Sequence, residues 1–201
     1  MTDRASAYLI ADAAEAAKSM AGFSQALAAA RPASVLLRAS GAALTADLVK
    51  ACQTAGAAAL VENDAALALI LGADGVHLSL QGGDEERSKR QAEARALLGA
   101  GRIVGVSCGL SRHDAMTAAE GGADYVAFDR PPGAEWEAAL DHIAWWAEAF
   151  EPPCVAWGAE SAEMAAALSQ AGADFVAAGP LGGYGEALAV LAGIGKPEPR
   201  R

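Results

Sequence analysis

Side chains that could bind an anion or a metal ion follow two short apolar runs of this sequence. Arg38 ends the run SVLLR, where a guanidinium is a fixed cation suited to phosphate or carboxylate. Glu62, Asn63 and Asp64 follow a second run; Asp64 could ligate Mg²⁺, and Asn63 could orient a ligand. Simpler interpretations stand beside these. Arg38 would pair with a neighbouring loop carboxylate, and Asn63 or Asp64 would cap the helix beginning near Ala65.

Four further side chains carry groups that are common in active sites. Ser107 ends an apolar run and could donate a hydrogen bond to a phosphate. His77 lies inside the run GVHL without an evident carboxylate partner, which favours a buried structural role over catalysis. Nothing marks a base beside Cys108, so a nucleophilic role is not predicted. His113 falls in the first turn of an expected helix and is assigned to the surface.

Glycines follow the last two apolar runs. Gly158 and Gly179 would let backbone N–H groups approach a phosphate, and the stretch 180–183 continues the second of these loops. Glu160 would repel an anion there. An earlier loop, Asp129–Gly133, begins with adjacent opposite charges that would pair with each other or with solvent, and continues with two prolines that would stiffen it.

The elements that must position these residues are short apolar runs alternating with helical segments. The expected strands are Tyr8–Ile10, Val35–Leu37, Ala58–Val61, Gly75–Leu78, Ile103–Ser107, Tyr125–Phe128, Cys154–Trp157 and Phe175–Ala178. The expected helices are Ala13–Ala29, Thr45–Gln53, Ala65–Leu71, Glu85–Leu98, Ser111–Glu120, Trp136–Phe150, Ser161–Gln170 and Glu186–Ala192, with Thr45, Ser111 and Ser161 as N-caps. Eight β/α units predict a single-domain α/β fold, a (β/α)8 TIM barrel over residues 1–195. An open doubly wound sheet is the alternative, and residues 196–201 form a polar, proline-broken tail.

The phrase Gly-Ala-Asp occurs three times at intervals of fifty residues, beginning at Gly72, Gly122 and Gly172. Each copy follows an alanine-rich segment and precedes an apolar run. Glycine accepts the left-handed conformation that closes a helix, so each copy indicates a helix that stops where a buried parallel strand begins. In such a barrel the loops after the strands carry the chemistry, which places Arg38 and Ser107 at the same end.

Composition narrows the class of protein. The net charge of −10 argues against a nucleic-acid surface, and no apolar run is long enough for a membrane helix. Three dispersed cysteines and a start without a signal-peptide pattern indicate the cytoplasm. Trp145 and Trp146 cannot share one helix face; either one of them marks a homo-oligomer surface, or both pack on the barrel.

Several of these motifs together resemble the thiamine-phosphate synthase family, including its thiazole-tautomerase relatives. The family has an Asn-Asp pair before an alanine- and leucine-rich helix and a GADGVHLGQ-type strand, and residues 63–78 match this order. Residues 103–107 resemble its IGVS strand, and residues 121–128 resemble its AGADYVGFG strand. The resemblance extends from about Val35 to Ala178. It implies a TIM barrel that joins an aminopyrimidine diphosphate to a thiazole phosphate and releases pyrophosphate.

The resemblance also implies roles for individual residues. Arg38, Asn63 and Ser107 match catalytic positions that bind the phosphorylated substrate. Asp64 matches a Mg²⁺ ligand, while Gly158 and Gly179 fall near the thiazole-phosphate loops. The family's second metal carboxylate has no direct match: the nearest acid is Asp84, two residues late.

The sequence departs from the family pattern at several charged positions. A glutamine and a lysine around Arg38 are missing, and Asp129–Gly133 replaces the Thr-x-Thr-Lys loop. The glycine pair after the seventh run has become Trp157-Gly158. Two function hypotheses follow: a divergent thiamine-phosphate synthase in which Asp84 and Arg130 stand in for lost groups, with retained or reduced activity, or a non-catalytic paralogue that binds a phosphorylated thiamine-related metabolite or a partner protein.

Overall fold

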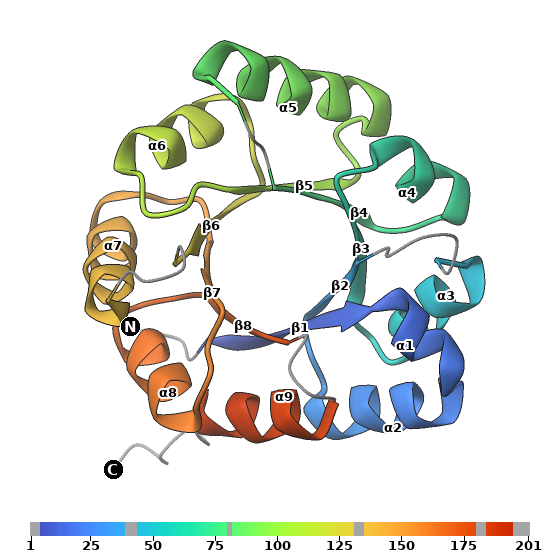
Figure 1. The fold of residues 1–201 in the computed structure, drawn as a ribbon. Helices are drawn as coiled ribbons and strands as arrows, with labels where there is room; N and C mark the ends of the chain where they lie inside the picture. Colours follow the sequence, from blue (N-terminus) through green and yellow to red (C-terminus); the bar gives the residue numbers. More distant parts are fainter. Residues whose placement is uncertain (1–4, 39–43, 80–81, 131–134, 180–183, 195–201) are drawn as a thin grey trace.

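Eight parallel strands close into a barrel, and helices surround it as an outer ring (Figure 1). The computed structural model describes residues 5–38, 44–79, 82–130, 135–179 and 184–194. The strands pair in sequence order, and β1 closes the barrel against β8. The predicted TIM barrel is confirmed and the open sheet is excluded. The expectations for 131–133, 180–183 and the tail 196–201 fall outside the described residues.

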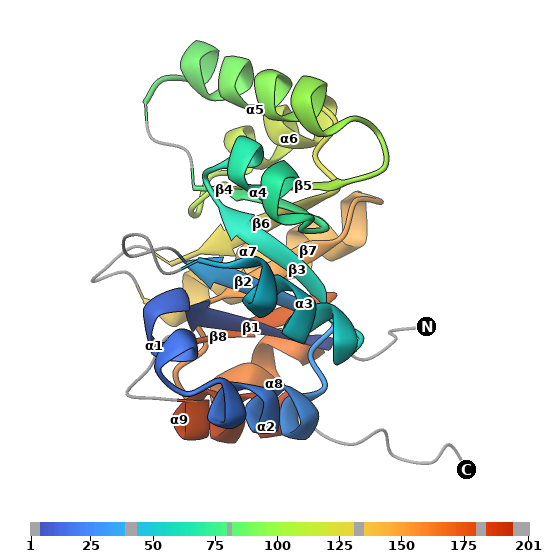
Figure 2. The ribbon, with the colours of Figure 1, turned by 90° about the vertical axis from the view of Figure 1, so that its right-hand side faces the viewer.

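The elements follow the expected alternation closely. The strands are β1 Ser6–Asp12, β2 Ser34–Arg38, β3 Ala58–Glu62, β4 Gly75–Leu78, β5 Ile103–Ser107, β6 Tyr125–Asp129, β7 Cys154–Trp157 and β8 Phe175–Ala178. The helices are α1 Ala13–Lys18, α2 Met20–Ala30, α3 Ala46–Thr54, α4 Ala65–Leu71, α5 Asp84–Leu98, α6 Arg112–Glu120, α7 Trp136–Ala149, α8 Ala162–Gln170 and α9 Tyr184–Leu191, followed by a 3₁₀ turn at Ala192–Ile194. Figure 2 shows α5 and α2 on opposite flanks of the barrel.

One expected helix, Ala13–Ala29, is two helices in the structure. The break falls at Ser19, whose backbone leaves the helical region (φ −145°, ψ 77°) and whose hydroxyl accepts a hydrogen bond from Gly22 N–H. Serine competes for backbone groups in this way, so a cap inside an alanine-rich segment outweighed the helix propensity of its neighbours. The expected caps Ser111 and Ser161 also accept N–H groups, whereas Thr45 makes no side-chain capping bond.

Apolar side chains fill both faces of the sheet. The larger core lies between the strands and the helices, and a smaller cluster fills the barrel interior. The interior cluster consists of the buried residues Tyr8, Ile10, Leu36, Leu60, Tyr125, Ala127, Val155 and Ala177. Because side chains alternate across a strand, the residues two positions further along point to the mouth of the barrel. These include Asp12, Arg38, Glu62, Asp129 and Trp157.

The repeated Gly-Ala-Asp phrase makes the same contacts in all three copies. Its glycines have positive φ angles of 70°, 81° and 106°, as expected for helix termination. Its aspartates, Asp74, Asp124 and Asp174, then bind the preceding strand twice. The backbone N–H of each aspartate donates to a carbonyl oxygen near the start of that strand, in Ala59, Val104 and Cys154 respectively. Each aspartate carboxylate accepts the N–H of the same residue, at 2.8, 2.7 and 2.8 Å. The aspartate therefore fastens each strand to its predecessor.

We predict that Asp174→Ala lowers the free energy of unfolding by about 2 kcal/mol, because a charge-assisted hydrogen bond to a partly buried N–H contributes about 1.5–3 kcal/mol. Asp174→Asn keeps an acceptor oxygen and should cost less than half as much. Urea unfolding of both variants measures the difference. Equal losses in the two variants would contradict a role for the acceptor.

Among the described residues, no helix is both long and apolar enough to cross a membrane.

Candidate functional site

Arg38 lies at the carboxyl end of β2 and pairs with Glu62 at the end of β3. Its Nε donates to Glu62 Oε1 at 3.0 Å, and the two side chains are 38% and 21% exposed. The expected salt bridge of Arg38 to a neighbouring carboxylate is therefore present, and the carboxylate belongs to Glu62, the last residue of β3. An anionic ligand at Arg38 would have to share the guanidinium with Glu62.

A second arginine–carboxylate pair lies at the ends of β6 and β7. Arg130 Nη2 donates to Glu160 Oε1 at 3.0 Å, while Asp129 accepts the N–H of Gly109 at 2.9 Å. The expectation that Asp129 and Arg130 pair with each other is wrong. Adjacent residues on an extended strand point to opposite faces, so each side chain finds a partner on a different neighbouring loop.

Asn63 and Asp64 are exposed between β3 and α4, and each has one structural bond. Asp64 is the N-cap of α4 and accepts Leu67 N–H through Oδ1 at 2.8 Å. Asn63 has a positive φ of 56° and accepts Ser79 N–H through Oδ1 at 2.8 Å. These bonds leave the amide Nδ2 of Asn63 and the Oδ2 of Asp64 without a partner among the described residues.

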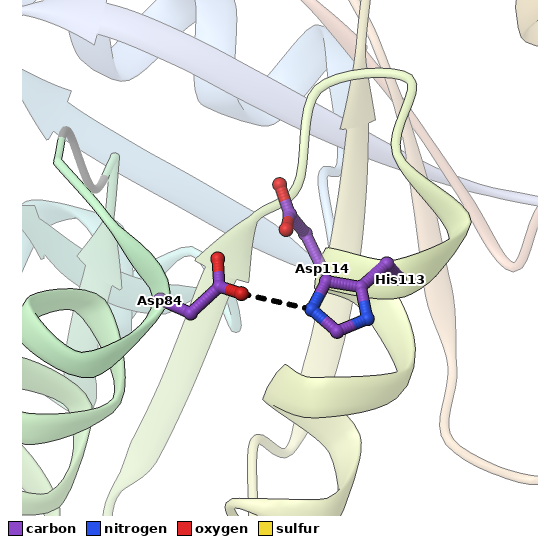
Figure 3. A group of neighbouring side chains, drawn as sticks. All are labelled: Asp84, His113 and Asp114. Atoms are coloured by element: carbon purple, nitrogen blue, oxygen red, sulfur yellow. Dashed lines mark hydrogen bonds and ion pairs between the residues drawn. The ribbon is translucent and has the colours of Figure 1, made fainter.

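Asp84 lies on α5, beside His113 and Asp114 of α6 (Figure 3). Its Oδ2 is 3.0 Å from His113 Nε2, and one ligand atom from each of the three residues lies within 4.8 Å of the others. Arg87 binds Asp114 at 2.6 Å and is a competing cation in the group. Asp64 is not part of this group. His113 is exposed, as expected.

Gly158 and Gly179 both have positive φ angles at the ends of β7 and β8, 77° and 101°. A Cβ at Gly179 would meet the carbonyl oxygen of Ile10 at 2.4 Å, whereas none of the described residues lies within 4 Å of a Cβ at Gly158. Gly179 is thus required by packing against β1, and Gly158 by backbone conformation. At both positions the main chain, without a side chain, faces the end of the barrel.

The polar side chains of the barrel interior form a continuous hydrogen-bonded chain. Ser107 Oγ lies 3.0 Å from His77 Nε2, and His77 Nδ1 lies 2.8 Å from the hydroxyl of Tyr125. The Tyr125 hydroxyl is in turn 3.0 Å from that of Tyr8. We name these four residues the interior chain. It satisfies both nitrogens of His77, which confirms the predicted structural role for this buried histidine.

Trp157 covers the interior chain. Its indole stacks on the His77 ring with centroids 4.6 Å apart and planes 15° apart, and it lies 5.6 Å from the Tyr8 ring. Burial of His77 disfavours its charged form and, with the nearby Arg38, lowers its pKa to about 3. The imidazole is therefore neutral over the working pH range of most enzymes.

The cysteines and the paired tryptophans pack within the protein. All three cysteines are buried, and burial raises the pKa of Cys108 to about 12, so its thiol is protonated and unreactive. Trp146 is buried; Trp145 is partly buried, packs on Phe150 and is covered by Arg112 at 4.7 Å. Both tryptophans pack against the protein, as in the second of the two interpretations.

A hollow of about 1340 Å³ lies at the amino-terminal face, between α2, α3 and the start of β1. It is lined mainly by small and apolar residues, such as Ala28, Ala33 and Ala51. The strand ends that carry Arg38 and Ser107 are at the opposite end of the barrel, so this hollow is separate from the candidate site.

Comparison with known families assigns the chain. The family model described as thiamine monophosphate synthase matches residues 7–179, which include every strand except the first residue of β1. The chain belongs to the thiamine monophosphate synthase family.

Curated members of the thiamine monophosphate synthase family match parts of the chain. The thiamine-phosphate synthase of Rhodospirillum centenum is 49% identical over 116 residues, 55% of this chain and 53% of that protein. The thiamine-phosphate synthase of Erythrobacter litoralis is 42% identical over 144 residues, 68% of this chain and 65% of that protein. The alignments thus span between half and two thirds of these relatives.

A solved structure supports the family's fold. The thiamine phosphate pyrophosphorylase of Pyrococcus furiosus superposes with a TM-score of 0.70 at 18% identity, covering 94% of this chain and 95% of that one. Wild-type GGGPS from Thermoplasma volcanium superposes with a TM-score of 0.67 at 16% identity, covering 96% of this chain and 92% of that one. At these identities the likeness concerns the barrel alone.

Sequence reasoning missed three features of this thiamine monophosphate synthase family member. The pairing of Glu62 with Arg38 is not evident from sequence, and the bulk of Trp157, which favours the non-catalytic paralogue, does not predict that its indole stacks on His77. Tyr8 and Tyr125 were counted as strand residues. The sequence contains a signal for these two tyrosines, because a tyrosine or histidine at an inward-facing strand position needs a polar partner inside the barrel.

Proposed function

We propose that this chain is a thiamine-phosphate synthase-like enzyme that joins hydroxymethylpyrimidine diphosphate to thiazole phosphate. In this reaction the bond from the pyrimidine methylene carbon to the diphosphate oxygen breaks, pyrophosphate leaves, and the thiazole nitrogen forms a new bond to that carbon. The observation that carries the proposal is the family match over residues 7–179, within which Arg38, Asn63, Asp64 and Ser107 lie at or directly after the carboxyl ends of β2, β3 and β5.

The chemistry requires stabilisation of negative charge on the leaving pyrophosphate. Arg38 supplies a fixed positive charge at the end of β2, and Asn63 Nδ2, which has no partner among the described residues, supplies a neutral donor after β3. Ser107 is partly exposed at the end of β5 and adds a hydroxyl. The bare main chain at Gly158 and Gly179 is suited to the phosphate of the thiazole substrate.

Mg²⁺ is the cofactor that the family implies. The uncommitted Oδ2 of Asp64 fits a divalent cation that also binds substrate phosphates, since Mg²⁺ usually takes one or two carboxylates and completes its shell with phosphate and water. Asp84 fits less well, because His113 occupies its Oδ2. When bound, the cation would neutralise charge on the departing pyrophosphate.

The direct test is pyrophosphate release from the two purified substrates with Mg²⁺, with each substrate omitted in turn. Release that requires both substrates, with thiamine phosphate as the product, is the expected result. Absence of release, together with calorimetric binding of either substrate, would support the non-catalytic paralogue instead.

We predict that Arg38→Ala lowers kcat/KM by about 10- to 100-fold, because one charge-assisted hydrogen bond to the substrate contributes about 1.5–3 kcal/mol. Lys89→Ala is the matched control: it removes the same charge from the exposed face of α5 and should leave kcat/KM unchanged. An equal loss in both variants would show that net charge, and not Arg38, controls the rate.

The proposed partners are phosphorylated small molecules, and the proposed location is the cytoplasm. Homo-oligomer formation stays a prediction, which the packing of Trp145 and Trp146 does not support.

A further inference from the structure

The interior chain has one closed end and one open end. Tyr8 is 1% exposed, and its hydroxyl contacts only the hydroxyl of Tyr125 among the described residues. Around it lie the apolar side chains of the interior cluster. Ser107, at the other end, is partly exposed at the mouth of the barrel. Any ligand there can meet the hydroxyl of Ser107 but not that of Tyr8.

The direction of the hydrogen bonds along the chain depends on His77. Its ring is fully buried, and burial lowers its pKa to about 3, so one ring nitrogen carries a hydrogen and the other accepts. Tyr8 and Tyr125 keep their protons as well, since burial raises the pKa of both hydroxyls. Two positions of the histidine hydrogen are then consistent with the three contacts: Nε2–H, the outward arrangement, and Nδ1–H, the inward arrangement. The inward arrangement has two variants, which differ in whether Tyr125 or Tyr8 donates the hydrogen bond between the two hydroxyls.

In the inward arrangement, Ser107 O–H donates to His77 Nε2, and Nδ1–H donates to Tyr125. Either Tyr125 O–H then donates to Tyr8, or Tyr8 O–H donates to Tyr125, whose oxygen accepts twice. In both variants one buried hydroxyl hydrogen has no acceptor among the described residues, which is destabilising.

In the outward arrangement every buried hydrogen has an acceptor. Tyr8 O–H donates to Tyr125, Tyr125 O–H donates to Nδ1, and Nε2–H donates to Ser107 Oγ. Nε2–H occupies a lone pair of the serine oxygen, so the serine hydrogen is free to point into the mouth. The closed end of the chain therefore selects the outward arrangement.

We propose that His77 is a positioning residue: Tyr125 holds it as the Nε2–H tautomer, and it turns the Ser107 hydroxyl outward as a hydrogen-bond donor to an anionic group of the substrate. The identity of the anionic group, the diphosphate of the pyrimidine substrate, rests on the proposed function. The tautomer of His77 does not depend on that function. This role differs from catalysis, since His77 does not reach the mouth itself.

Two neighbours keep the His77 ring and its partner in place. Trp157 stacks on the ring and restricts its rotation. Gly105 leaves room for Tyr125, because a Cβ at position 105 would lie 1.9 Å from the Tyr125 Cζ atom. The geometry of the interior chain is thus set by packing from both sides.

The test is nitrogen NMR of the whole chain labelled with ¹⁵N-histidine, without ligand. We expect a pyrrole-type Nε2 and a pyridine-type Nδ1 for His77, with the signals assigned by their loss in His77→Gln. His142 is an internal reference of the opposite kind, since its Nδ1 lies 2.7 Å from the carbonyl oxygen of Ala138 and must donate to it. A protonated Nδ1 in His77 would overturn the proposal.

Two variants separate positioning from general stability. Tyr125→Phe removes the donor to Nδ1 and should give a mixture of both His77 tautomers. Tyr8→Phe keeps that donor, so Nε2–H should remain the single tautomer. A single Nε2–H form in Tyr125→Phe would show that Tyr125 does not set the tautomer, which would overturn the proposal.

A binding cycle with inorganic pyrophosphate as the probe tests the outward hydroxyl. Ser107→Ala should weaken binding about 10- to 100-fold, in keeping with one hydrogen bond to an anion. Tyr125→Phe should weaken binding in the parent protein but have no further effect when Ser107 is already alanine. Additive losses would overturn the positioning role. If the tautomer and the binding cycle are as expected but no pyrophosphate is released from the substrates, the proposed function fails while the positioning role stands.

Discussion

Gly105→Ala should lower the free energy of unfolding by about 3 kcal/mol, at the upper end of the range for an overpacked core. The new methyl group would lie 1.9 Å from Cζ and 2.4 Å from the hydroxyl oxygen of Tyr125. Tyr125 is held at its hydroxyl by Tyr8 and His77, and its ring packs on the His77 ring, so it cannot move aside without breaking these contacts. Thermal and urea unfolding would measure the loss.

Gly101→Ala is the matched control for this substitution. A Cβ at Gly101 meets nothing within 4 Å, and its φ angle does not lie in the left-handed region, so alanine should be neutral or slightly stabilising. If Gly105→Ala proved as well tolerated as Gly101→Ala, Tyr125 would not be fixed where the structure has it.

Acid should destabilise this protein through His77, by about 3 kcal/mol between pH 7 and pH 4. The folded-state pKa of His77 is lowered to about 3, first by burial and second by Arg38, the charged group that acts on it. Below about pH 6.5 the unfolded chain binds a proton that the folded chain excludes. The contribution is therefore fully present above pH 6.5 and is lost as the pH falls toward 3.

Carboxylates also titrate in this pH range, so the effect of His77 is measured as the difference in unfolding free energy between the parent protein and a His77 variant. Urea unfolding of the parent protein and of His77→Gln at several pH values should give curves that diverge below pH 6.5, by about 1.4 kcal/mol per pH unit. Parallel curves would mean that the buried ring is protonated as easily in the folded chain as in the unfolded one. Glutamine is the chosen replacement because it retains a donor and an acceptor for Ser107 and Tyr125.

Two arginines near the strand ends of the candidate site are balanced by glutamates of the same protein. Arg38 and Arg130, the cations at the ends of β2 and β6, each have a glutamate partner on the next strand or loop. These pairs lower the net positive charge available to a diphosphate.

Sequence by itself determined the order of the elements and the end of the barrel where chemistry belongs. Strand lengths, glycine stops and serine caps are properties of a few adjacent residues, so they can be read locally; the break at Ser19 was missed because a single hydroxyl competed with a long helical pattern. The family resemblance, and with it the candidates Arg38, Asn63, Asp64 and Ser107, also came from local motifs.

Tertiary structure alone decided which of these residues have partners. Arg38 and Glu62 are 24 residues apart, His77 and Tyr125 are 48 apart, and Tyr8 and Tyr125 are 117 apart. Such pairs depend on the register of neighbouring strands and on which strands face each other across the closed barrel. No local pattern encodes that register, because it results from packing the whole interior at once.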